Sequence, residues 1–428
     1  MTRRLRIGAL QLRAHDRDAF AQQTQRLLAL TAEAARDRDV LVLPEGTLPA
    51  YVLGDDGIDD AAVAATLRAL EAIAGERDCA IVVGAALRRE GRLYNSAAVI
   101  DRTGTLAGTA DKLFLWHFDR KWFDAGSRVE PVRTSVGTLG VLVCADGRMP
   151  ELSRGLVDRG AEILVMPTAW VTSGRDPHRL ENAQADLLAR MRAFENGVPF
   201  VAANKCGVER AMVAYCGKSQ IVDGAGEIAA IASEREETLV HASVAIGDAP
   251  RPRASRPHLS PAAPTARGVV RVALCAGTMP ADVAARVALL DADGALDAHA
   301  EFGDAFGARL GLARVEAHAA IDPGTLVAYR AAGYRTIALH AREAHPWLAS
   351  LARARALELR LFVVVFEPER AYAVDPDGTI VAGTFDDFRI ASTAFDLART
   401  EQTAVAPSTD ILDGLARVSA ALGNGSAR

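Results

Sequence analysis

The chain has 428 residues, of which 50% are hydrophobic and 24% charged, and its formal net charge is −5. This balance is typical of a globular protein with two or three domains, and the lack of a basic excess argues against nucleic acids and membrane surfaces as partners. No apolar stretch reaches the roughly 18 residues that a membrane-spanning helix needs. The opening MTRRLRIGALQL has only a short apolar run broken by Arg, which is typical of a first strand rather than a signal peptide.

The five cysteines indicate neither a disulfide framework nor a zinc site, because their number is odd, their spacing is irregular and none forms a CxxC pair. The nine histidines are scattered without metal-ligand spacing. We therefore expect a cytoplasmic protein with reduced thiols, no bound metal and no cofactor.

Strand and helix signals alternate through the first 245 residues. The patterns predict strands at 5–12, 39–45, 79–87, 138–144, 161–170 and 198–205, helices at 18–37, 61–78, 150–160 and 177–197, and hairpins at 93–112 and 217–232. Strand–helix repeats with interposed hairpins predict an α/β layered domain with mixed sheets.

A second α/β segment follows a stretch with five prolines and no periodicity at 247–268, which indicates a linker. In that segment LVAYRAAGYRTIALH echoes LSRGLVDRGAEILVMP, and YAVDPDGTIVAG echoes SQIVDGAGEIAA, in the same order along the chain. We predict a first domain at 1–246 and, at 269–428, a shortened and diverged copy of its later half. The alternative is a chance likeness between generic α/β patterns.

Three predicted elements of the first domain end on reactive side chains. Glu45 ends the run DVLVLPE, Lys112 follows the hairpin at TADK, and Cys144 ends TLGVLVC. A buried cysteine is usually a small core hydrophobe, but sites of α/β proteins collect at the carboxyl ends of strands. A carboxylate, an ammonium and a thiol at such ends suit a thiol hydrolase. The carboxylate takes the thiol proton, and the ammonium with the backbone N–H after the cysteine holds the oxyanion.

These segments resemble the nitrilase superfamily of carbon–nitrogen hydrolases. LPEGTLPAY, DKLFLW and GVLVCADGRMPEL are similar to the family's Glu, Lys and Cys segments, and GAEILVMPTAW, RAFENGVPFVAANKCG and GKSQIVDGAGEI follow in the family's order. The resemblance implies Glu45 as general base, Lys112 as stabiliser of the intermediate and Cys144 as nucleophile. It also implies a four-layer α-β-β-α sandwich, which would make the second domain a smaller nitrilase-like α/β unit.

The sequence departs from the family pattern at several positions. The family often has a second glutamate after the lysine, and HFDRKWFDAG places Asp119 there, one methylene shorter. Asp119 either takes that role or is only a surface residue. Ala145 replaces an aromatic residue that often follows the cysteine, and we expect Ala145 and Trp170 to line the substrate or oxyanion pocket. Trp170 as a core aromatic is the alternative.

The resemblance implies hydrolysis of a small amide or N-carbamoyl compound through a Cys thioester, because CAD is closer to the amidase and carbamoylase branches. Nitrile hydrolysis with the same triad and a non-catalytic regulatory homologue are the alternatives. The second segment lacks lysine and an LPE-type glutamate, so Cys275 is expected to be structural. The expected partner is the small amide substrate. The expected assembly is a homo-oligomer or an intramolecular pseudo-dimer.

Overall fold

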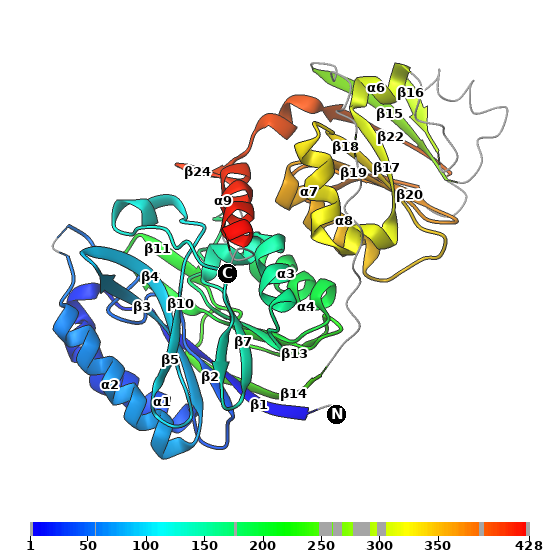
Figure 1. Cartoon of the computed structure of the whole chain (residues 1–428). Coiled ribbons are helices and arrows are strands. Elements are labelled where there is room, and N and C mark those ends of the chain that lie inside the picture. The colour runs from blue at the N-terminus through cyan, green and yellow to red at the C-terminus, as the bar shows by residue number, and fades with distance from the viewer. Residues whose placement is uncertain are drawn as a thin grey trace. The chain divides into compact units, whose positions relative to one another are not determined.

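The computed structural model describes residues 3–55, 57–174, 178–247, 259, 268–276, 292–297, 305–384 and 389–424. The chain divides into two compact units (Figure 1). Unit 1 comprises Met1–Arg251, Ala406–Thr409 and Asp413–Arg428, and unit 2 comprises Pro252–Val405 and Asp410–Leu412. Most of the predicted linker at 247–268 lies outside the described residues.

Unit 1 is built from two mixed sheets and the helices that flank them. Its strands are β1 (Arg3–Arg13), β2 (Val40–Val42), β3 (Ala80–Arg89), β4 (Arg92–Ile100), β5 (Leu106–Asp111), β6 (Val132–Thr134), β7 (Gly137–Val141), β8 (Ile163–Pro167), β9 (Phe200–Ala203), β10 (Lys205–Glu209), β11 (Val213–Cys216), β12 (Gln220–Val222), β13 (Ile228–Ile231) and β14 (Thr238–Ile246). Its helices are α1 (Phe20–Ala34), α2 (Asp60–Arg77), α3 (Pro150–Asp158), α4 (Ala189–Asn196) and most of α9 (Ile411–Asn424). Four short helical turns are η1 (Arg17–Ala19), η2 (His117–Lys121), η3 (Cys144–Arg148) and η4 (Gln184–Leu188).

The two sheets face each other and helices cover their outer faces. One sheet has the order β11-β10-β1-β2-β3-β4-β5, with β14 also paired to β1, and the other has the order β13-β12-β9-β8-β7-β6. Helices α1 and α2 pack on the first sheet, and α3 and α4 on the second (Figure 1). The predicted four-layer α-β-β-α sandwich is confirmed. Its central strands are parallel and buried on both faces, which explains unbroken apolar runs such as VLV in β2.

The long helix predicted at 177–197 begins later than expected. Residues 178–182 are not helical, and a π-helical turn, η4, precedes α4. The side chain of Asn182 accepts a hydrogen bond from the Gln184 N–H at 2.9 Å, and the Asp186 carboxylate accepts one from the Asn182 N–H at 2.9 Å. These side chains satisfy backbone donors at the helix start, which the apolar periodicity does not reveal.

Unit 2 contains a second set of strands and helices. Its elements are β15 (Val269–Cys275), β16 (Gly294–Leu296), α6 (Ala305–Leu310), β17 (Leu312–Glu316), η5 (Ala317–Ile321), α7 (Pro323–Ala331), β18 (Thr336–His340), α8 (Leu348–Leu359), β19 (Phe362–Phe366), β20 (Ala371–Val374), β21 (Ile380–Gly383), β22 (Ile390–Asp396) and η6 (Leu397–Glu401). The short strands β23 (Ala404–Ala406) and β24 (Thr409–Asp410) follow, and each has residues in both units. The larger strands form sheets in the orders β16-β15-β22 and β17-β18-β19-β20-β21.

The strand pairing of unit 2 parallels that of unit 1. Strand β8 pairs parallel with β9, β9 antiparallel with β12, and β12 antiparallel with β13. Strands β18, β19, β20 and β21 pair in the same way, and both hairpins have a register shift near their turn. The second copy at 269–428 remains a prediction, with one difference in extent. The predicted boundary puts residues 413–428 in the second domain, whereas the structure groups them with unit 1.

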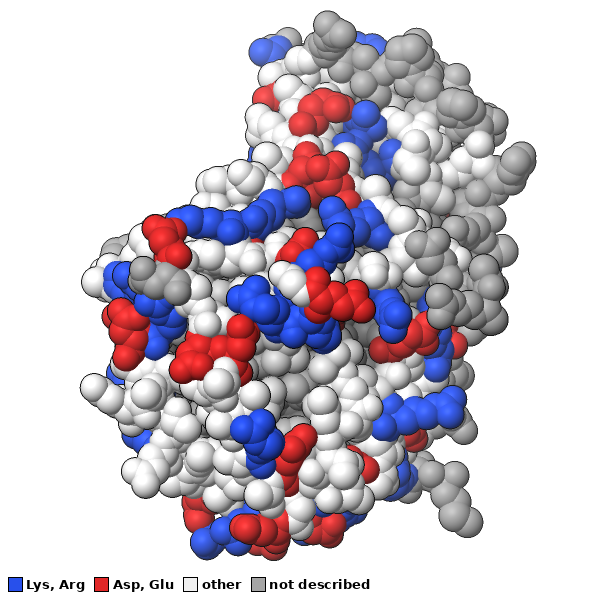
Figure 2. Space-filling model, turned by 60° about the vertical axis from the view of Figure 1, so that its left-hand side comes forward, with Lys and Arg blue, Asp and Glu red and all other residues white. Residues whose placement is uncertain are grey.

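Two properties of the surface and the helices bear on partners. On the face drawn in Figure 2, acidic and basic side chains of the described residues are interspersed. In the part of the chain that the structure describes, no helix has both the length and the apolar character needed to cross a membrane.

Gly84 in β3 allows the loop after β2 to lie against the strand. The Gly84 N–H donates to the Pro44 carbonyl at 3.1 Å, and the Thr47 N–H donates to the Gly84 carbonyl at 3.1 Å. A Cβ at Gly84 would lie 2.4 Å from the Cα of Glu45 and 2.5 Å from the Pro44 carbonyl oxygen. The position of Glu45 therefore depends on the presence of glycine, which has no side chain, at position 84 of the neighbouring strand.

We expect Gly84→Ala to lower the free energy of unfolding by about 1–3 kcal/mol, because backbone rather than a flexible side chain must move. Urea unfolding monitored by circular dichroism measures this. The matched control is Gly75→Ala in α2, where the nearest atom to the new Cβ lies at an ordinary 3.6 Å and helix propensity favours alanine. Equal stability of Gly84→Ala and the wild type would contradict the role of Gly84.

Candidate active site

The structure brings three charged side chains together in the interior of unit 1. Lys112 Nζ lies 2.7 Å from Oε1 of Glu45 and 2.5 Å from Oδ2 of Asp119, and all three side chains are fully buried. Glu45 lies in the loop after β2, Lys112 follows β5, and Asp119 belongs to η2. The predicted Glu–Lys pair is thus a direct contact.

Two side-chain donors and one backbone acceptor hold Glu45 in place. Its Oε1 accepts hydrogen bonds from Lys112 and from the Asn95 amide on β4, each at 2.7 Å, and its N–H donates to the Thr168 carbonyl at 3.2 Å. Oε2 is buried and receives no hydrogen bond of standard geometry from the described residues. One oxygen of Glu45 is therefore fixed and the other is left for a proton donor.

Cys144 begins η3 with a left-handed backbone, φ +45°. This conformation is uncommon for a residue other than glycine and occurs at functional sites. The thiol lies beside the Glu45 carboxylate, and it also lies against Thr168 and the backbone of Ala169. Cys144 is therefore next to the Glu45–Lys112–Asp119 cluster.

The cluster changes the protonation of its members. Burial raises the pKa of Glu45; the charge of Lys112 opposes this rise, and the charge of Asp119 adds to it. Burial alone would lower the pKa of Lys112, but the charges of Asp119 and Glu45 outweigh it and hold that pKa well above its usual value. Burial and the charge of Glu45 raise the pKa of Cys144 to about 12. At neutral pH the site therefore contains an ammonium beside a neutral thiol.

Asp146 links the segment after the cysteine to the segment after the lysine. Its Oδ1 accepts hydrogen bonds from the N–H groups of Leu113 at 3.1 Å and Phe114 at 2.8 Å, and its Oδ2 accepts one from Val143 at 3.2 Å. Burial raises the pKa of Asp146 to about 7. This carboxyl group sets the distance between the backbones on either side of the site.

Asp119 is not the surface residue that the alternative interpretation allowed. Its Oδ2 accepts a hydrogen bond from the Trp116 N–H at 2.9 Å and contacts Lys112. The shorter side chain thus reaches the lysine directly, because η2 brings its backbone close. Its catalytic role stays a prediction.

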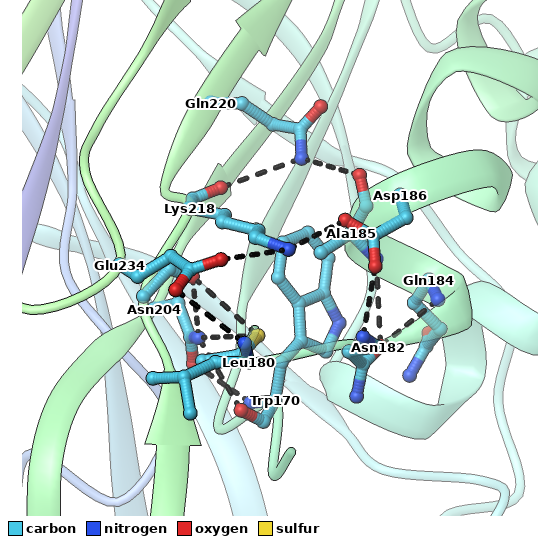
Figure 3. A network of polar contacts seen from close by, with 12 residues as sticks. Trp170, Leu180, Asn182, Gln184, Ala185, Asp186, Asn204, Lys218, Gln220 and Glu234 are labelled. Atoms are coloured by element: carbon cyan, nitrogen blue, oxygen red, sulfur yellow. Dashed lines mark hydrogen bonds and ion pairs between the residues drawn. The ribbon is translucent and has the colours of Figure 1, made fainter. Parts of the chain in front are cut away.

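The two predicted pocket residues are both buried. Ala145 follows Cys144 in η3 and is 1% exposed, as is Trp170 after β8. The Trp170 N–H donates to Asn204 at 2.7 Å, and the Asn204 amide donates to the Gly217 carbonyl at 2.7 Å (Figure 3). The indole Nε1 is buried without a hydrogen-bond partner among the described residues. Their contact with substrate stays a prediction.

An ion-pair network supports the loops around Trp170. Lys218 Nζ lies 2.8 Å from Asp186 of η4 and 3.4 Å from Glu234 (Figure 3). Sequence reasoning did not find this network, or Asn95 and Asp146. Asp146 stands in the quoted cysteine segment, so its position was a usable signal, whereas nothing in the spacing singles out Asn95. Among the described residues, no group of three or more His, Cys, Asp or Glu side chains is arranged to hold a metal ion.

Comparison with known proteins identifies the family. A model of the carbon–nitrogen hydrolase family matches residues 4–251. The chain belongs to the carbon–nitrogen hydrolase family. It is 32% identical over 227 residues to an (R)-stereoselective amidase of a Pseudomonas species, covering 52% of this chain and 79% of the relative. It is 34% identical over 226 residues to a hydrolase of Pseudomonas protegens, covering 51% and 76%.

A solved structure gives the same result. A carbon–nitrogen hydrolase from Helicobacter pylori is 26% identical with a TM-score of 0.50, and the similarity covers 56% of this chain and 89% of that chain. The family match spans most of unit 1 and none of residues 252–428. The chain is thus an enzyme of the nitrilase superfamily.

The pKa directions predict how alkylation of Cys144 depends on pH. We expect the rate with iodoacetamide to rise through an apparent pKa above 4.5, the ordinary value of glutamate, because Glu45 must be ionised to take the thiol proton. No second rise is expected near ~8.5, where an ordinary thiol ionises. Peptide mass spectrometry of the labelled enzyme measures the rate. The control is Glu45→Gln, in which the rise that depends on Glu45 should be absent. A rise near ~8.5 in both the wild type and this variant would contradict the assignment, because the thiol would then ionise without Glu45.

Asp119 should influence Glu45 through its charge. We call the rise of the Cys144 alkylation rate with pH that depends on Glu45 the acid limb. We expect Asp119→Asn to move this acid limb to lower pH, because the charge of Asp119 raises the pKa of Glu45. It should also lower kcat, since Lys112 loses one of its two carboxylate partners. Asp124→Asn, at an exposed residue in the same segment, is the matched control. An unmoved limb would show that Asp119 does not act on Glu45.

Proposed function

We propose that this enzyme hydrolyses a C–N bond of a small, non-peptide amide or N-carbamoyl compound. The observation that supports this proposal is the contact of Glu45 with Lys112 beside the Cys144 thiol, in a buried site. The named amidase among the relatives points to the same class of substrate.

In the first half of the reaction, Cys144 Sγ attacks the carbonyl carbon while Glu45 takes the thiol proton. The raised pKa of Glu45 makes it a suitable acceptor and, once protonated, a suitable donor. The oxyanion is stabilised by Lys112, whose charge its carboxylate partners maintain, and by the Ala145 N–H. The intermediate then expels the amine, Glu45 gives it the proton, and a thioester on Cys144 remains.

In the second half, water enters the position that the amine has left. Glu45 takes a proton from this water as its oxygen attacks the thioester carbonyl, and the same donors hold the second oxyanion. The C–S bond breaks, Cys144 regains its proton from Glu45, and a carboxylic or carbamic acid leaves. The buried site limits water access during the first half, which favours completion of the acyl transfer.

The proposal is tested by release of ammonia or amine from a panel of small amides, ureido acids and nitriles, with Cys144→Ala as the blank. We expect release from at least one amide or ureido acid, and a thioester adduct on Cys144 in the mass spectrum of the quenched enzyme. Activity on nitriles alone would make the enzyme a nitrilase. No turnover and no adduct on any compound would favour the regulatory homologue.

We propose further that unit 2 is a diverged, non-catalytic copy. No lysine occurs after residue 218, so unit 2 cannot repeat the Glu–Lys–Cys arrangement. Its Cys275 is buried at the end of β15, and burial raises the pKa of this thiol to about 11. Cys275→Ala should therefore leave amide hydrolysis unchanged.

A further inference from the structure

The last helix of the chain belongs to unit 1, although unit 2 precedes it in the sequence. The segment 406–409 and residues 413–424 of α9 group with residues 1–251, and residues 252–405 with 410–412 form the separate unit. Unit 2 is thus inserted between unit 1 and its final helix. This final segment contacts the segments of unit 1 that hold the candidate active site.

Thr409 contacts the backbone of η2. Its buried hydroxyl accepts a hydrogen bond from the His117 N–H at 2.7 Å. His117 has a left-handed backbone, φ +48°, which is uncommon for a residue other than glycine. Two residues later, Asp119 contacts Lys112. Thr409 therefore stabilises the turn that places the second carboxylate.

Gly414 lies against both segments that flank the site. A Cβ at this position would be 2.6 Å from the Phe114 ring and 3.1 Å from the sulfur of Met149. Phe114 follows Lys112 by two residues and donates its N–H to Asp146, while Met149 follows directly after η3, which Cys144 begins. Helix α9 thus packs where the lysine segment and the cysteine segment meet.

The far end of α9 is fixed on α3. A Cβ at Gly155 would lie 2.2 Å from a Leu422 methyl group, and the Arg159 guanidinium donates to the Leu422 carbonyl at 3.0 Å. Figure 1 shows α9 beside α3. The helix is therefore fixed on α3 at one end and on Phe114 at the other, and Thr409 just before it contacts η2.

We propose that residues 406–409 and 413–424 complete the active site, with Thr409 and Gly414 as positioning residues for Asp119 and Lys112. This inference rests on the proposed function, since it assigns Asp119 and Lys112 to that reaction. Neither residue touches the reacting atoms. Thr409 acts through the backbone of His117, and Gly414 acts by allowing Phe114 and Met149 to approach α9.

The test uses the full chain with paired variants. Thr409→Val keeps the shape of the side chain but leaves the His117 N–H without its acceptor, and Thr409→Ser restores the hydroxyl. We expect Thr409→Val to lower both kcat and the rate of Cys144 alkylation by about tenfold and to shift the acid limb of alkylation, with KM little changed. Thr409→Ser should return these values to within about twofold of the wild type.

The second pair tests the packing of α9. Gly414→Ala forces Phe114 away, whereas Gly423→Ala places the same methyl group on the same helix with nothing within 4 Å. We expect Gly414→Ala to reproduce the effect of Thr409→Val and Gly423→Ala to match the wild type. Thermal unfolding of each variant establishes that the measured enzyme is folded.

The outcomes separate this inference from the proposed function. Alkylation of Cys144 needs no substrate, so an altered limb in Thr409→Val supports the positioning role even if no amide is hydrolysed. A lower melting temperature with unchanged kcat and an unchanged limb overturns it, because Thr409 would then be only structural. Equal behaviour of Thr409→Val and Thr409→Ser also overturns it, whatever the wild type hydrolyses.

Discussion

A single lysine between two carboxylates, all without access to water, is the constraint on which this active site depends. Removing one partner from such a cluster leaves a buried charge uncompensated. Glu45 and Asp119 keep Lys112 charged, and the second carboxylate makes Glu45 easier to protonate. A group that both accepts and returns a proton needs that condition, so the ion cluster that stabilises the interior also prepares the acid–base chemistry beside Cys144.

The surrounding fold keeps this cluster in register mainly through the backbone. Gly84 lets the Glu45 loop lie against β3. Asp146 accepts hydrogen bonds from backbone N–H groups of the segment after Lys112 and of the segment before Cys144. The two facing sheets supply these segments from strand ends far apart in the chain. If only side-chain hydrogen bonds held the cluster, the long and flexible side chains of Lys112 and Glu45 would have to be ordered by their mutual contact alone. Anchoring their backbones first reduces the conformational entropy lost when Lys112 and Glu45 meet.

The sequence was sufficient for the layered fold of unit 1 and for the meeting of Glu45 and Lys112, because strand ends converge in α/β sheets. It left Asp119 between two interpretations, since the reach of a short carboxylate depends on the turn at His117. Asn95 could not be found, because it lies inside β4 rather than at a strand end, and nothing in its spacing relates it to Glu45. Residues 413–428 were assigned to the second domain because chain order was the only guide, and no local pattern in 411–424 indicates which surface this segment covers.

The insertion of unit 2 explains how such a remote segment can still contact the site. The entropic cost of closing a loop grows only slowly with its length, by about 0.6 kcal/mol for each doubling. By this relation, returning the chain to unit 1 after residues 252–405 costs about 3 kcal/mol more than returning it after a flexible loop of about six residues. The packing of Leu422 on Gly155 and the hydrogen bond of Thr409 can offset a cost of that size. A bracing helix can thus be separated from its active site by a whole folded unit, provided that its two ends find fixed partners there.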